Sequence, residues 1–194
     1  MTSSFSVSSP DEMITSFPNS ALPKIISESH YESLVELRHA LKDNYSLIPS
    51  RIVGGTYGYL GGLKPDAVYA IVALGKLFVI PPDPGQLIIP SGTNSVTSGN
   101  LHRDHAEAAR EFKELVNLER AGKQQIVEAI SKTFLAGILD RNQGFAHLWL
   151  RDIVAHLITE YGQVENKDLV RNCLKFSESW DANRPFQELV QRIH

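Results

Sequence analysis

The stretch that decides the fold is N-Q-G-F-A-H-L-W-L-R-D-I-V-A-H-L-I-T-E-Y-G at residues 142–162. Its apolar residues recur at helical spacing and form one stripe with a second stripe beside it. A face that broad packs against neighbours on two sides, so we expect a central helix, capped by Asn142 and ended by Gly162. The two stripes consist of Phe145, Trp149, Ile153 and Leu157, widened by Leu150, Val154, Ile158 and Tyr161.

Two shorter helices are expected between this helix and the end of the sequence. Cys173 lies on an apolar face of the first and is interpreted as a small packed hydrophobe. The second follows Asn183, with Pro185 in its first turn. Its apolar pattern is interrupted at His194, from which we expect the natural polypeptide to continue. The residues predicted as packing or self-association anchors are Trp149, Trp180, Phe186, Leu189 and Ile193.

Upstream, a polar stretch at residues 90–100 is expected to separate a helical domain at residues 99–194 from a mixed region at residues 23–98. The helical domain opens with a long charged helix, and Gly122 is expected to divide that helix in two. Its apolar face contains Ala108, Phe112, Leu115 and Val116.

The mixed region combines a helix of roughly four turns, which begins near Ser29, with segments rich in glycine and proline. Five glycines at residues 54–62 predict a shaped loop whose Tyr57 and Tyr59 pack on the core. A short helix is expected after Pro65, and two short strands around P-P-D-P-G at residues 81–85. Residues 1–22 are rich in Ser, Thr, Asn and Pro and predict a disordered leader.

Composition limits the class of protein. The chain has 194 residues, a net charge of −3 and one cysteine, which favours one ordinary domain in a reducing compartment, with the cytoplasm as the expected location. No apolar run has the length of about 20 residues that spans a bilayer, so we expect no membrane partner. Because the charge is slightly negative in both halves, we expect nucleic-acid binding by this segment alone to be weak, and a steep salt dependence of binding would indicate otherwise.

The residues with catalytic or metal-binding chemistry do not form a constellation in the sequence. His102 and His105, with Asp104 or Glu107, resemble a metal site only partly, because two imidazoles share a helix face but do not follow H-E-x-x-H. His147 and His156 are out of phase on the central helix. We therefore predict no catalytic residues, no cofactor, no metal and no small-molecule substrate.

Several segments, in this order, resemble the Gag capsid-like region of copia-type long-terminal-repeat retrotransposons. The segments are the glycine-rich stretch near residues 54–63, F-V-I-P-P-D-P-G at 78–85, A-E-A-A-R-E-F at 106–112, I-x-x-x-Y-G in looser form at 153–162, and W-D-A-N-R-P-F-Q-E-L-V-Q-R-I at 180–193. The resemblance covers about residues 23–194, and the zinc knuckle that often follows in that family is not present in this sequence.

The resemblance implies a multi-helix capsid-like bundle that self-associates into a particle around RNA, with RNA packaging through segments outside this chain. The sequence alone therefore predicts a mainly α protein with a structural role and homo-oligomers as its assembly. Two alternatives remain: a helical protein–protein adaptor that binds a partner through a groove, and a metal-dependent hydrolase that uses His102 and His105.

Overall fold

The computed structural model describes residues 9–26, 31–162 and 173–174. In these residues the chain is mainly α-helical, as the sequence predicts, and β pairing is limited to two isolated bridges. The elements are α1 (Pro10–Ser16), α2 (Tyr31–Leu47), the 3₁₀ turn η1 (Gly55–Tyr57), α3 (Leu60–Leu63), α4 (Asp66–Val72), α5 (Ser95–Ala129), α6 (Lys132–Leu135) and α7 (Leu150–Tyr161).

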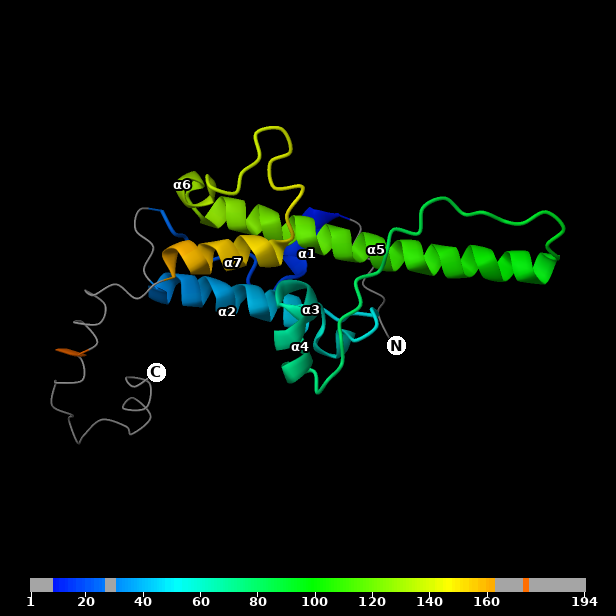
Figure 1. Cartoon of the computed structure of the whole chain (residues 1–194), viewed down its shortest axis with the longest axis horizontal. Coiled ribbons are helices and arrows are strands. Elements are labelled where there is room, and N and C mark those ends of the chain that lie inside the picture. The colour runs from blue at the N-terminus through cyan, green and yellow to red at the C-terminus, as the bar shows by residue number, and fades with distance from the viewer. Residues whose placement is uncertain (1–8, 27–30, 163–172, 175–194) are drawn as a thin grey trace.

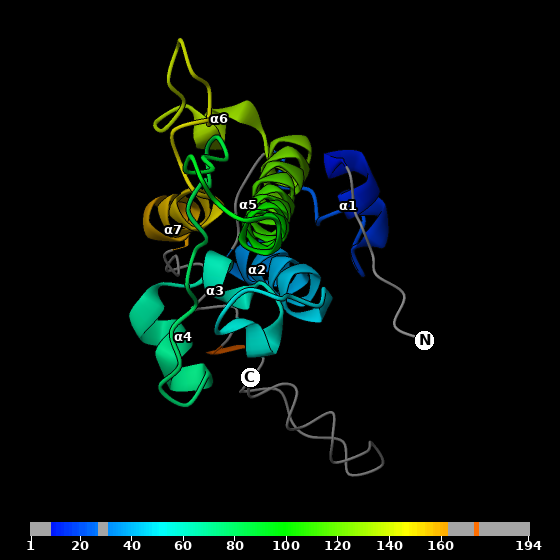
Figure 2. The same ribbon diagram turned by 90° about the vertical axis from the view of Figure 1, so that its right-hand side faces the viewer.

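The long helix α5 organises the molecule. Its C-terminal half lies inside the body, with α1 on one side, α7 on the other and α2 beneath (Figures 1 and 2). Its N-terminal half projects from the body, and residues 80–94 run alongside that half as an extended segment (Figure 1). The body therefore forms around only one half of this 35-residue helix.

The central position expected for α7 is confirmed, but its predicted start is wrong. α7 contacts α2, α3, α5 and α6, and Gly162 ends it as predicted. It begins at Leu150 instead of near Asn142, because Asp140 Oδ1 accepts hydrogen bonds from the backbone N–H groups of Asn142 and Gln143 at 2.8 Å each. These bonds fold the preceding residues into a turn.

The expected disordered leader is wrong for residues 9–22. Ser9 and Glu12 form a capping box at the start of α1, and Pro10 occupies its first turn. Met13, Phe17 and Leu22 are buried in the main core, so this segment repays its ordering entropy by apolar burial. Residues 1–8 lie outside the described part of the chain.

A buried polar cluster holds the segment after α1 onto α2 and α5. Asn44 Nδ2 donates to Gln125 Oε1 at 3.0 Å, and Asn44 Oδ1 accepts from the backbone N–H of Asn19 at 2.8 Å. Gln125 Nε2 donates to the carbonyl oxygens of Asn19 and Ser20 at 2.8 and 2.9 Å. These bonds satisfy two side-chain amides that are almost fully buried.

The glycine-rich stretch contains helical turns that its composition argued against. Gly61 lies in α3, where an added Cβ would come within 2.2 Å of the Phe78 side chain, so glycine permits a close approach here. Tyr59 is buried as predicted, whereas Tyr57 is 41% exposed, so the prediction for Tyr57 is wrong. α4 follows Pro65 as predicted, but residues 76–90 are irregular and the two expected strands do not form.

The predicted break at Gly122 is also wrong, because α5 continues through it to Ala129. A Cβ at Gly122 would lie 2.4 Å from Tyr45 Oη and 2.6 Å from Leu150 Cδ2, so this glycine permits close helix packing rather than ending the helix. α5 ends at Ala129, and after a short break α6 begins at Lys132. One hydrophobic core includes buried residues from both sides of the boundary expected at residues 98 and 99.

Candidate interaction surfaces

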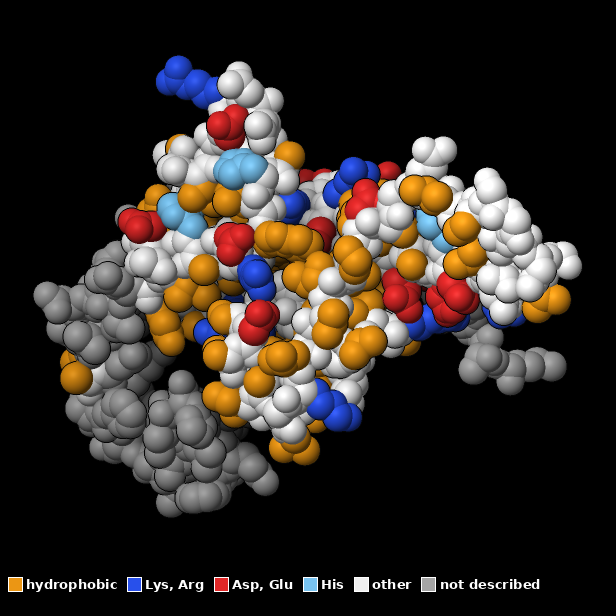
Figure 3. Space-filling model, turned by 45° about the vertical axis from the view of Figure 1, so that its right-hand side comes forward, with side chains coloured by type: hydrophobic (Ala, Val, Ile, Leu, Met, Phe, Trp, Pro, Cys, Tyr) orange, Lys and Arg blue, Asp and Glu red, His pale blue; other side chains and the backbone are white. Residues whose placement is uncertain are grey.

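An apolar ridge on α4 and the segment after it is exposed in the described structure. Ile71 is 79% exposed and Leu74 is 89% exposed. The backbone N–H of Val79 donates to the Val53 carbonyl oxygen at 3.0 Å, which brings Val53 beside Val79. Figure 3 shows hydrophobic side chains gathered on this face. The apolar ridge comprises Val53, Val68, Ile71, Val72, Leu74, Leu77 and Val79.

Single exposed aliphatic residues are common on protein surfaces. A group of neighbouring exposed aliphatic residues is uncommon and is typical of an interaction site. Only Tyr69 of the helix D-A-V-Y-A-I-V is buried, although five of its seven residues are aliphatic or alanine. The sequence signal was therefore available: α4 is apolar around much of its circumference, whereas a helix at the edge of a body can bury only one face.

The second candidate surface is the projecting arm, which we define as residues 95–114 of α5. None of these residues is buried, and burial begins at Leu115. At about 1.5 Å per residue the arm is roughly 30 Å long. The extended segment of residues 80–94 covers part of one side of the arm. In this contact His105 Nε2 lies 3.0 Å from the Gly85 carbonyl oxygen. The other side carries the exposed polar and charged residues of the arm.

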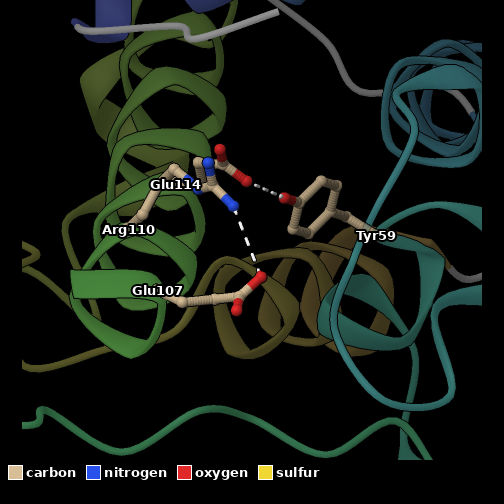
Figure 4. A network of polar contacts seen from close by, with 4 residues as sticks. All are labelled: Tyr59, Glu107, Arg110 and Glu114. Carbon is tan, nitrogen blue, oxygen red and sulfur yellow. Dashed lines mark hydrogen bonds and ion pairs between the residues drawn. The ribbon is translucent and has the colours of Figure 1, made fainter. Parts of the chain in front are cut away.

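The base of the arm is attached to α3 by a tyrosine–glutamate contact. Tyr59 Oη donates to Glu114 Oε2 at 3.2 Å, while Arg110 pairs with Glu107 at 3.5 Å one turn further out (Figure 4). Burial raises the pKa of Tyr59 well above its ordinary value, and the charge of Glu114 raises it further. The phenol therefore stays protonated and serves as a hydrogen-bond donor that fixes where the arm leaves the body.

Glu119 is a buried carboxyl group whose pKa is raised by its surroundings. Burial raises the pKa of Glu119 to about 7. A hydrogen bond of 2.9 Å from the backbone N–H of Leu150 acts in the opposite direction and lowers the pKa by a smaller amount. Its Oε1 atom has no hydrogen-bond partner among the described residues. Glu119 borders a cavity of about 470 Å³ that Lys123, His147 and Trp149 also line. Because one carboxyl oxygen is engaged by the first N–H of α7, we interpret Glu119 as a helix-capping group.

The structure describes only one of the five predicted anchors. Trp149 is partly buried against the core directly before α7, and its backbone N–H donates to Asp152 Oδ2 at 3.1 Å. Trp180, Phe186, Leu189 and Ile193 lie outside the described residues. Cys173 is exposed, so the prediction of a packed thiol is wrong.

The candidate metal ligands lie on the arm. His105 contacts the Gly85 carbonyl oxygen, and His102 and Asp104 are exposed to solvent. Within the described ranges, no group of three or more His, Cys, Asp or Glu side chains is placed to hold a metal ion. His156 Nε2 lies 3.3 Å from the Phe134 carbonyl oxygen, and its ring meets the edge of Tyr161, so it contributes to the packing of α6 on α7.

Among the residues that the structure describes, no helix combines the length and the hydropathy needed to cross a membrane. The fold and these surfaces define the class only coarsely, as a mainly α protein with exposed apolar surface. Comparison with protein-family models, with curated proteins and with solved structures gave no match.

Proposed function

We propose that this chain is a structural, self-associating module of the Gag capsid-like type, with a second copy of the same chain as its partner. The observation that carries the proposal is the apolar ridge, which is solvent-exposed while the core of the same body is closely packed. Burying the ridge against a second copy removes apolar area from water at about 25 cal/mol per Å².

The composition of the ridge supports a contact between copies. Lys76 is the one charged residue between Leu74 and Val79, so each copy brings one cation to this part of the contact, and the long lysine side chain can keep that charge in water. A symmetric contact places the same patch on both partners, which a charge-poor surface tolerates well. The low net charge of −3 adds little long-range repulsion between copies.

The size of the ridge indicates a weak individual contact. Stable interfaces use about 20 to 30 residues on each side, whereas the ridge supplies seven. Association through the ridge alone is therefore expected only at high protein concentration. The projecting arm supplies a second surface, and two weak contacts on one chain reinforce each other through effective concentration.

The ordered motifs that resemble copia-type Gag lead from self-association to the more specific proposal of a particle-forming protein, located in the cytoplasm. Light scattering after size-exclusion chromatography, at several loading concentrations, tests this function. We expect the mass to rise with concentration above that of one 21.6 kDa chain, and particles to appear by negative-stain electron microscopy. A single monomer mass at every concentration contradicts the proposal.

A further inference from the structure

A groove between α2 and α7 gathers basic side chains that are far apart in the sequence. It has a volume of about 550 Å³, within the range of small-molecule sites. α2 and α7 run side by side in opposite directions, and α3 and α4 close one end (Figure 1). The basic residues lining the groove are Arg38, His39, Lys42, Lys64 and Arg151.

The groove is elongated and differs between its two ends. On α2 its wall extends from Tyr31 to Lys42, or about 16 Å at 1.5 Å per residue. Tyr31 and Val35 stand opposite Ile158 and Val154 of the antiparallel α7, which makes one end apolar. Lys64 and Arg151 belong to the other end, where α3, α4 and the start of α7 meet.

The positive charges in the groove are poorly compensated. Arg151 pairs with Asp66 at 3.4 Å, but Arg38, Lys42 and Lys64 have no ion-pair partner within the described part of the chain. Among the described residues that line the groove, none carries a carboxylate. Burial lowers the pKa of Lys64, and the neighbouring charges of Arg38 and Lys42 lower it further.

We propose that this groove binds an amphiphilic organic phosphate, with the phosphate at Arg38, Lys42 and Lys64 and the aliphatic part along the wall of Val35, Val154 and Ile158. A dianionic phosphate compensates several cations, and the guanidinium of Arg38 offers a two-pronged donor for its oxygens. The apolar wall favours an aliphatic chain over a purely ionic ligand. This ligand class departs from the sequence-based expectation that the chain binds no small molecule.

Isothermal titration calorimetry of the full chain with decyl phosphate, kept below its critical micelle concentration, tests the proposal. We expect a dissociation constant below about 100 µM and one site per chain. Lys64→Gln and Arg38→Gln should each weaken binding about tenfold or more. Lys113→Gln, which removes an exposed charge on the arm, should leave binding unchanged. Circular dichroism melting shows whether each variant is folded.

Two further probes separate the ionic and apolar contributions. Sodium phosphate lacks the aliphatic chain and should bind at least tenfold more weakly than decyl phosphate. Decyltrimethylammonium has the chain with a positive head group and should not bind measurably. The proposal is overturned if decyl phosphate gives no heat of binding, or if sodium phosphate or decyltrimethylammonium binds as tightly as decyl phosphate. It is also overturned if neither groove substitution weakens the binding of decyl phosphate. Self-association through the apolar ridge is measured separately, on the chain without ligand. Val68 of the ridge also lines the groove, but the two groove substitutions, at Arg38 and Lys64, lie outside the ridge.

Discussion

Glu119 in the C-terminal half of α5 accepts a hydrogen bond through Oε2 from the backbone N–H of Leu150, the first residue of α7, at 2.9 Å. The contact joins α5, the longest described helix, to α7, which packs against α2, α3, α5 and α6. It also buries a carboxyl group whose other oxygen is unpaired among the described residues. A structural cap has therefore been built from an ionisable group in an unfavourable environment.

The stability of the protein should therefore depend on pH through Glu119. Burial raises its pKa from 4.5 to about 7, so the folded state holds a proton that the unfolded state has already lost between these pH values. The free energy of unfolding should fall as pH rises from about 4.5 to about 7, by on the order of 3 kcal/mol, and then level off. Urea unfolding at a series of pH values measures this dependence.

Glu119→Gln tests the same group without removing its hydrogen bond to Leu150, because the amide oxygen still accepts. This variant should be more stable than the parent at pH 8 by about 1 to 3 kcal/mol, and should lose the decline between pH 4.5 and 7. Glu128→Gln changes an exposed glutamate of the same helix and should keep the decline. A decline that persists in Glu119→Gln would assign it to another group.

Gln125 should be essential to the attachment of the N-terminal segment. Gln125→Ala leaves Asn44 Nδ2 and the carbonyl oxygens of Asn19 and Ser20 without this partner, so we expect a loss of about 2 to 4 kcal/mol in urea unfolding. The neighbouring Gln124→Ala removes only an exposed contact to Glu128 and should change stability by less than about 0.5 kcal/mol.

Limited proteolysis adds a local readout for the same pair. Gln125→Ala should increase cleavage at residues 17–26 under native conditions, whereas Gln124→Ala should not. Equal cleavage of both variants would show that the polar cluster does not hold this segment.

Two glycines of α5 should respond in opposite directions to the same substitution. Helix propensity alone favours Ala over Gly by about 1 kcal/mol at both positions. Gly99 has open space around it, so Gly99→Ala should leave the unfolding temperature unchanged or raise it. Gly122→Ala places a methyl group against Tyr45 and Leu150, and overpacking should cost about 1 to 3 kcal/mol. Thermal unfolding of both variants measures the difference, and stabilisation by Gly122→Ala would contradict the close packing described here.

The sequence predicted those parts of the fold that depend on local periodicity. The 3.6-residue pattern located α2, Gly162 marked the C-terminal end of α7, and Pro65 marked the start of α4, since each of these signals lies within one short segment. It failed where the deciding contact is distant. The segment after α1 is held by Asn44 and Gln125, and Gly122 is required by Tyr45, which lies 77 positions away in the sequence.

The two candidate surfaces also differ in whether local sequence or distant packing determines them. The apolar ridge follows from an α4 sequence that is apolar around most of its circumference, which was visible but not used. The basic groove was missed because charge was assessed along the chain, where Arg38, Lys64 and Arg151 are isolated. Only the packing of α2, α3 and α7 places them together.

Sedimentation velocity of matched ridge variants tests the proposed self-association most directly. Leu74→Glu adds a charge on the ridge, while Leu139→Glu makes the same change at a 48% exposed leucine between α6 and α7, away from the ridge (Figure 1). We predict concentration-dependent association for the parent and for Leu139→Glu, with a loss of about tenfold or more in affinity for Leu74→Glu. A parent chain that stays monomeric at every concentration, or association unchanged by Leu74→Glu, would contradict the account.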